Sequence, residues 1–203
     1  ACAPYRRLHL CHHNLESIQT NNYNSGNAKH DLLLEVCMAA KYEGNSIETP
    51  YTKHEQTNPD SQLCTVLARS FADIGDIVRG RDLFYGNTQE KEKRDKLDEN
   101  LKKIFEKIHE GLDRKIKSNY NDAPYYYKLR EDWWYANRAT IWEALTCDPR
   151  HKAEYFRKTC GGSGKTATQA SHKCRCDGTN ANQVPTYFDY VPQYLRWFEE
   201  WAE

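Results

Sequence analysis

Residues 63–80 read LCTVLARSFADIGDIVRG, and this stretch predicts one helix around which the rest of the chain is organised. Proline and aspartate precede it and Gly80 follows it, as is typical of helix ends. Its apolar side chains recur at helical spacing and form one stripe: Leu63, Leu67, Phe71, Ile74 and Val78. Arg69, Asp73 and Asp76 fall on the opposite face, within reach of one another. We expect this segment to be the central helix of a bundle.

Gly75 lies in the middle of this predicted helix, where a glycine costs about 1 kcal/mol relative to alanine. Such a glycine needs a structural reason, and we expect the close approach of a neighbouring helix beside Phe71. Cys64 lies on the same side as Gly75, where it can form a disulfide bond with a distant segment.

Two helices flank the central one in sequence. Residues 30–42 (HDLLLEVCMAAKY) predict a helix that ends at Gly44, and residues 45–59 predict a loop. Residues 88–118 predict a long amphipathic helix whose charged face pairs acids with bases four positions later, which is typical of a solvated surface. Its apolar stripe consists of Leu97, Leu101, Ile104, Ile108 and Leu112.

The C-terminal third predicts two more helices and a long irregular segment. Residues 126–146 predict a helix with Leu129, Trp133, Ala136, Ile141 and Leu145 inward, and at least two of its tryptophans are expected in the core. Residues 147–185 show no strand pattern and only a possible short helix near residues 153–158. A final helix begins at Pro192, with Leu195, Phe198 and Ala202 facing inward. The fold class predicted from these patterns is all-α.

Composition restricts the classes of partner. Lys and Arg number 29, as do Asp and Glu, which argues against whole-surface binding to nucleic acid or anionic membrane. No run of 18 apolar residues occurs, so we expect no direct membrane insertion by this segment. The chain lacks an initiator Met and a signal peptide and stops inside a predicted helix, so we expect it to be a piece of a longer protein.

The eight cysteines favour disulfide bonds and an oxidising location over reduced, buried thiols. Single cysteines lie in three predicted helices far apart in sequence, which suits long-range bonds better than a metal site.

Three motifs invite other chemistry, and none is favoured. GGSGKT at residues 161–166 resembles the end of a phosphate-binding loop, but Thr159 stands where that loop needs glycine. Cys160, Cys174 and Cys176 could bind zinc, although their spacing is unlike that of the usual zinc knuckles. The histidines at positions 9, 12 and 13 are interpreted as a solvated helix start and not as metal ligands, on the view that no carboxylate or third ligand follows them at fixed spacing. We therefore expect no enzyme, no cofactor and no metal, and keep a zinc- or nucleotide-binding domain as a remote alternative.

Six segments in order identify a resemblance over the whole chain: CAPYRRLHLC, LLLEVCMAAKYEG, LARSFADIGDIVRGRDLF, LREDWW, IWEALTC and YVPQYLRWFEEWAE. They resemble the alpha class of Duffy-binding-like domains in the erythrocyte membrane protein 1 adhesins of Plasmodium falciparum. The resemblance implies a disulfide-stapled helical bundle, mainly the family's second subdomain. Residues 1–24 would be the tail of subdomain 1, residues 25–185 subdomain 2 with its long disulfide-bounded loop, and residues 186–203 the first helix of subdomain 3.

The resemblance also implies disulfide pairings. Cys2 and Cys11 would pair with upstream cysteines that this chain lacks. Among the other six, we expect Cys37–Cys147, Cys64 with Cys176 or Cys174, and Cys160 with whichever of those two remains.

The function implied by the resemblance is adhesion at the extracellular face of the infected erythrocyte. Partners would be receptors on host erythrocytes or endothelium, heparan sulfate or blood-group glycans, host antibodies, and neighbouring domains of the same adhesin. The alternative is an antigenically variable scaffold or display module with no ligand of its own. The glycan candidates are the cations least clearly matched by acids: Arg6, Arg7, Arg79, Arg81, Lys91, Lys93 and Arg94.

Overall fold

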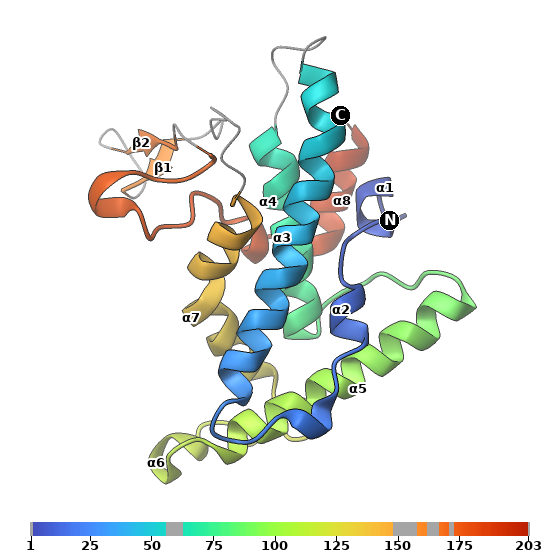
Figure 1. The fold of residues 1–203 in the computed structure, drawn as a ribbon, viewed down its shortest axis with the longest axis vertical. Helices are drawn as coiled ribbons and strands as arrows, with labels where there is room; N and C mark the ends of the chain where they lie inside the picture. Colours follow the sequence, from blue (N-terminus) through green and yellow to red (C-terminus); the bar gives the residue numbers. More distant parts are fainter. Residues whose placement is uncertain (1, 56–62, 148–157, 162–166, 171–172, 203) are drawn as a thin grey trace.

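The computed structural model describes residues 2–55, 63–147, 158–161, 167–170 and 173–202, and most of them are helical (Figure 1). The elements are α1 (Tyr5–Leu8), α2 (His13–Glu16), η1 (Thr20–Asn22), α3 (Ala28–Glu55), α4 (Leu63–Arg79), α5 (Thr88–Glu110), α6 (Arg114–Lys117), α7 (Tyr127–Leu145), β1 (Lys158–Cys160), β2 (Thr168–Gln169), η2 (Gly178–Asn180), η3 (Phe188–Tyr190) and α8 (Gln193–Ala202). The predicted fold class, a disulfide-stapled all-α bundle, is confirmed. The three-part division at residues 24 and 185 stays a prediction. No helix in the described part of the chain is long and apolar enough to cross a membrane.

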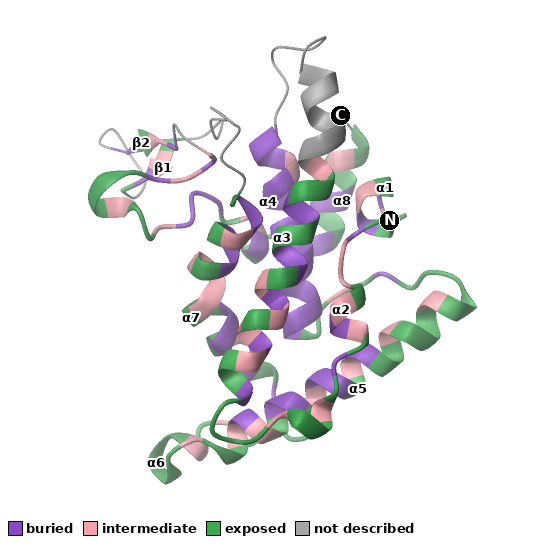
Figure 2. Cartoon of the chain, viewed as in Figure 1, coloured by how far each residue is buried: buried purple, intermediate pink, exposed green. Residues whose placement is uncertain are grey.

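Helix α4 is the centre of the bundle. It packs against α3, α7, η3, α8 and α1, while α5 lies across the lower end of the bundle in Figure 1. Every residue of α4 except Val66 is buried, and Figure 2 shows the helix covered along its length. The face carrying Arg69, Asp73 and Asp76 is therefore interior, which makes α4 a helix with a buried polar side.

The aromatic core explains the glycine of α4. The Phe71 ring lies 5.0 Å from the Trp134 ring and 5.2 Å from the Trp142 ring, centroid to centroid. A Cβ atom added at Gly75 would lie 2.7 Å from the Trp134 ring, so only glycine lets α7 approach this closely. The expected close helix approach is confirmed. All three tryptophans of α7 are buried, which meets the expectation for at least two of them, whereas Ala136, predicted to face inward, is exposed.

Helix α3 is longer than its sequence pattern predicts. It continues past Gly44 and through residues 45–55, so the predicted helix end and loop start are wrong. A Cβ atom at Gly44 would lie 2.0 Å from the carbonyl oxygen of Leu145, at the end of α7. Gly44 is therefore required for helix packing and does not terminate the helix.

Helix α5 is shorter than predicted. It begins at a capping box in which Asn87 and Glu90 exchange side-chain and backbone hydrogen bonds. It ends at Glu110, and the chain then turns into α6. Gly111, which follows the helix, lies so close to the Ser25 carbonyl oxygen that an added Cβ atom would be 2.1 Å from it. Leu97, Leu101, Ile104 and Ile108 are buried as predicted, and Leu112 is partly buried.

Two further segments depart from expectation. Lys158–Cys160 and Thr168–Gln169 pair as a short antiparallel hairpin, where no strand was predicted. The possible helix near residues 153–158 lies mostly outside the described residues, and Lys158 belongs to β1. Helix α8 has the opposite orientation to the one predicted: Gln193, Arg196 and Trp197 are buried, whereas Leu195, Phe198 and Ala202 are exposed.

Candidate functional site

The buried acids of α4 anchor cations from both ends of the chain. Arg6 in α1 donates from Nη2 to Asp73 Oδ2 at 2.7 Å, and to Glu200 in α8 at 2.9 Å. Arg196 in α8 donates from Nη2 to Asp73 Oδ1 and to Asp76 Oδ2, each at 2.6 Å. This network binds the first and last helices to the central one, which explains why α8 turns Arg196 inward.

The pKa of Asp73 is set mainly by charge pairing, whereas the pKa of Asp76 is set mainly by burial. Burial raises the pKa of Asp73, but Arg6, Arg196 and a hydrogen bond from Gln193 more than offset it and hold that pKa below its ordinary value. Burial dominates at Asp76 and raises its pKa, with Arg196 and Arg79 opposing. Arg6 gains more from Asp73 and Glu200 than burial costs it, so its own pKa is raised.

Arg79 is part of the same interior. Its side chain is 1 % exposed and donates to Asp76 Oδ1 at 2.9 Å and to the Asp189 carbonyl at 2.6 Å. Asp189 in turn accepts from Trp134 Nε1 at 3.0 Å and from Arg138 at 2.7 Å. Arg79 therefore links α4 to η3. Because it is buried, it cannot contact a glycan, and the prediction that it is a glycan ligand is corrected.

Arg7 is also withdrawn from solvent. It forms a bidentate ion pair with Asp82, in which Nε donates to Oδ1 at 3.2 Å and Nη2 donates to Oδ2 at 2.5 Å, and its side chain is 1 % exposed. Its guanidinium lies over the Phe84 ring, 4.6 Å from the centroid, and Arg94 lies over the same ring at 5.7 Å. Arg94 also pairs with Asp82 at 3.6 Å and keeps 23 % of its side chain exposed. Arg6 and Arg7 are thus structural, and Arg94 is only partly available.

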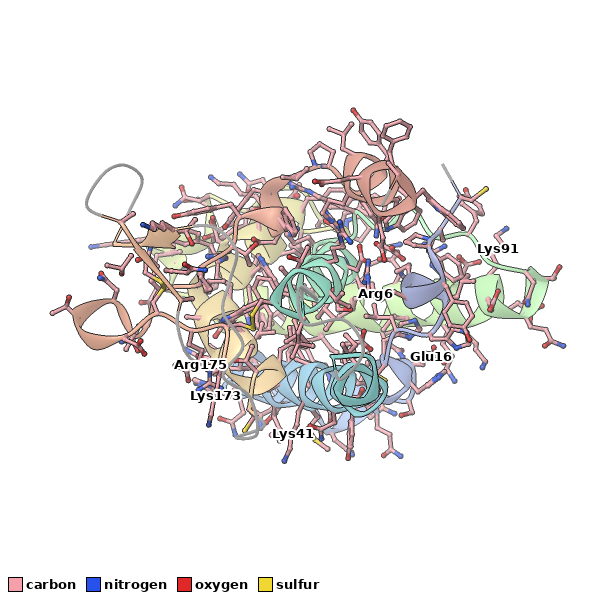
Figure 3. The ribbon with its side chains drawn as sticks, turned by 90° about the horizontal axis from the view of Figure 1, so that it is seen from above. Arg6, Glu16, Lys41, Lys91, Lys173 and Arg175 are labelled. Atoms are coloured by element: carbon pink, nitrogen blue, oxygen red, sulfur yellow. A yellow bond between two sulfur atoms is a disulfide. The ribbon has the colours of Figure 1, made fainter. Side chains whose placement is uncertain are left out.

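Three of the seven glycan candidates are exposed. Arg81 is 56 % exposed and pairs with Glu131 at 3.0 Å. Lys91 and Lys93 lie on the first turns of α5, are exposed, and form no ion pair within the described part of the chain. Figure 3 shows Lys91 on the same side of the molecule as Glu16, away from Lys173 and Arg175.

The cysteines form two disulfide bonds, Cys64–Cys174 and Cys160–Cys176. Cys64 thus pairs with the second of its two expected partners. The three cysteines considered as zinc ligands all lie in disulfide bonds, so the alternative of a zinc site there is wrong. The expected Cys37–Cys147 bond is absent, and both thiols are free. Cys37 is partly covered between α3 and α7, where burial and Glu143 raise its pKa to about 11, whereas Cys147 is exposed past the end of α7. Cys2 and Cys11 are also free.

A cluster that the sequence argument overlooked lies at α2. Glu16 Oε1 is 2.9 Å from His12 Nδ1 and 3.5 Å from His13 Nδ1. Contrary to the sequence-based interpretation, a carboxylate does follow at fixed spacing, four residues after His12. The pattern His-His-x-x-Glu in the sequence could have indicated this cluster. Burial and Arg7 lower the pKa of His12 to about 4, with Glu16 opposing.

Comparison with known families decides what this arrangement belongs to. The model of the Duffy binding domain matches residues 1–196. The chain belongs to the Duffy-binding family.

The solved structures that this Duffy-binding chain resembles include domains of the Plasmodium falciparum membrane protein 1 (PfEMP1). It resembles the NTS-DBL1(alpha-1) domain of membrane protein 1 (PfEMP1) from the varO strain, with a TM-score of 0.78 and 48% identity, over 100% of this chain and 43% of that one. It also resembles the DBLβ domain of a PfEMP1 bound to human ICAM-1, with a TM-score of 0.71 and 32% identity, over 98% of this chain and 39% of that one.

An ICAM-1-binding DBLβ domain of the IT4var13 PfEMP1 matches with a TM-score of 0.69 and 36% identity, over 98% of this chain and 41% of that one. This Duffy-binding chain therefore spans less than half the length of these solved relatives. Comparison with curated proteins finds no significant match.

Proposed function

We propose that this chain is part of a non-enzymatic adhesion module that binds a host-cell surface from the exterior of the infected erythrocyte. The observation that carries the proposal is the match to PfEMP1 domains over the whole chain, two of which are described as binding ICAM-1. The expected partners are receptors on host erythrocytes or endothelium, in the setting of rosetting or cytoadherence.

A sulfated glycan, such as heparan sulfate, is the partner class that the exposed cations suit. Such a polyanion needs lysines and arginines that are reachable and not already neutralised. Lys91 and Lys93 meet both conditions, and Arg81 is reachable although it pairs with Glu131. We propose that Lys91 and Lys93 on the first turns of α5, with the partly exposed Arg94 of the same helix, form the contact.

Heparin affinity chromatography tests this contact. The double variant Lys91→Ala/Lys93→Ala should elute at clearly lower salt than the parent chain, and the retention of the parent should fall steeply with ionic strength. The matched control is Lys96→Ala/Lys103→Ala, which removes two exposed lysines from the same helix. If the two double variants elute at the same salt concentration, the site is rejected, because retention on heparin then depends only on overall charge.

The alternative is an antigenically variable scaffold that presents epitopes to host antibodies and supports neighbouring domains without a ligand of its own. The burial of Arg6, Arg7 and Arg79 favours it, because three of the expected ligand contacts serve the interior. Binding of the chain to uninfected erythrocytes and to ICAM-1 separates the two functions. Binding to neither, together with retention on heparin equal to that of the Lys91→Ala/Lys93→Ala variant, would favour the scaffold.

A further inference from the structure

His12, His13 and Glu16 bring three potential metal-ligand atoms together at α2, all within 4.8 Å of one another. Two of the three separations are 2.9 Å, between His12 Nδ1 and Glu16 Oε1, and 3.5 Å, between His13 Nδ1 and the same oxygen. This cluster is separate from the buried acids of α4, and it shares a cavity with Lys93 of the proposed glycan contact.

These separations match those between ligands of one transition-metal ion. Zinc takes imidazole nitrogen and carboxylate oxygen at about 2.0 to 2.2 Å, so two ligands lie about 3.0 Å apart at a right angle and about 3.4 Å apart at the tetrahedral angle. The observed pairs bracket this range. The ligand atoms of the two histidines lie within 4.8 Å of each other, and rotation of the exposed His13 side chain would bring all three atoms onto one ion.

Hydrogen bonding does not account for the cluster. His12 Nδ1 is buried and has no hydrogen-bond partner within the described part of the chain, although Glu16 Oε1 lies 2.9 Å away. The close approach therefore lacks the orientation of a hydrogen bond. A buried ring nitrogen without a partner is costly unless another group satisfies it, and a metal ion would do so.

The surroundings leave room to complete a coordination shell. A cavity of about 180 Å³ is lined by the three residues together with His9, Glu90 and Lys93. His13 is 78% exposed, so an ion can enter from solvent, while His12 and Glu16 hold the inner side. Water, or an anionic group attracted by Lys93, can fill the remaining position, as in zinc sites with three protein ligands.

The ligand set selects the kind of metal. Two imidazoles and one carboxylate suit zinc, copper or nickel, whereas calcium and magnesium require mainly oxygen ligands. The nearby Arg7 is neutralised by Asp82, and Glu16 supplies the negative charge for the ion. We propose that His12, His13 and Glu16 form a binding site for a divalent transition metal of the zinc class.

Cobalt titration with visible absorption spectroscopy tests the site, because tetrahedral Co²⁺ absorbs strongly where the free ion does not. The four free thiols are alkylated first, and mass spectrometry verifies that the slowly reacting Cys37 is fully modified, so that cysteines contribute no ligand. The parent chain should give a saturable 1:1 signal that Zn²⁺ abolishes and Mg²⁺ does not. His13→Ala and Glu16→Gln should each weaken binding by roughly tenfold or more, since even loss of a group that only supports a metal ligand costs about 10- to 100-fold.

The control is His30→Ala, which removes an exposed histidine outside the cluster and should leave the titration unchanged. His13 is exposed, so its loss should preserve the fold, and circular dichroism of each variant verifies this. The proposal is overturned if the alkylated parent gives no saturable signal, or if His13→Ala binds as tightly as His30→Ala.

Discussion

The guanidinium of Arg196 lies 2.6 Å from the Asp73 carboxylate, across a separation of 123 residues. This contact brings the last helix onto the middle of the central one. The same Nη2 atom also reaches Asp76, so one arginine satisfies two buried carboxylates. The start of the chain approaches the same acid through Arg6. Asp73 is therefore the point at which the two ends of the chain meet.

Replacing Arg196 by methionine should destabilise the fold, because it removes a partner from two buried carboxylates. Breaking such a pair typically costs about 3 to 5 kcal/mol, and we expect the lower end since Arg6 and Arg79 still pair with these acids. Urea unfolding followed by circular dichroism measures the loss. The control is Arg81→Met, whose exposed pair with Glu131 should be worth less than about 1 kcal/mol. Similar losses in the two variants would contradict the network.

Alanine at Gly44 provides a test in which two effects oppose each other. Intrinsic helix propensity favours alanine over glycine by about 1 kcal/mol in a helix interior. The added Cβ atom, however, would lie 2.0 Å from the Leu145 carbonyl oxygen, a backbone atom that can move only with α7. We expect a net loss of about 1 to 3 kcal/mol in the free energy of unfolding. Lys41→Ala, at an exposed position of α3, controls for the helix itself, and a stabilised Gly44→Ala protein would refute the close approach.

The two helical glycines show what a single sequence can and cannot supply. Gly75 stands inside an unbroken apolar stripe, so its cost within the helix indicated close packing, and the structure confirms it. Gly44 follows a shorter stripe and precedes polar residues, so it looked like a helix end. The physical cause is the same at both positions, but the neighbour that demands it at Gly44, Leu145, lies 101 residues away in sequence.

The buried cations escaped prediction for a similar reason. Periodicity places Asp73 and Asp76 on a polar face of α4, and an isolated amphipathic helix would turn that face to solvent. Counter-charges at positions 6 and 196 make burial possible, and nothing local in the sequence connects them to α4. The sequence next to Arg6 and Arg7 contains no acid to pair with them, because their partners, Asp73 and Asp82, are distant in the chain. The cluster at α2 differs, because its three residues lie within five consecutive positions and could therefore have been found from the local sequence.

Removing the two disulfide bonds should cost different amounts. The Cys64–Cys174 bond closes a separation of 110 residues and the Cys160–Cys176 bond one of 16. The chain-entropy model gives about 4.7 kcal/mol for a 100-residue loop and about 3 kcal/mol for a 15-residue loop. Cys64→Ala/Cys174→Ala should therefore lower the free energy of unfolding more than Cys160→Ala/Cys176→Ala. Cys2→Ala, at an exposed free thiol, is the control, and the reverse order would contradict the loop argument.

Cys37 should react unusually slowly with iodoacetamide, and its reaction rate should depend strongly on pH. Burial, with Glu143 adding to it, raises the pKa of Cys37 to about 11. Only the thiolate reacts, so at pH 8.5 its reactive fraction is roughly 100-fold smaller than that of an ordinary thiol with a pKa of about 8.5.

The pH profile separates this effect from steric shielding. The alkylation rate of Cys37 should keep rising about tenfold per pH unit from pH 8 towards pH 11, whereas shielding alone would give a profile that levels off near pH 9. Glu143→Gln should speed the reaction and shift the profile to lower pH, while Glu99→Gln, at an exposed position of α5, should not. Mass spectrometry of unreduced peptides provides the readout. Recovery of Cys37 bonded to Cys147, instead of as an alkylated thiol, would contradict the two free thiols seen between α3 and the end of α7.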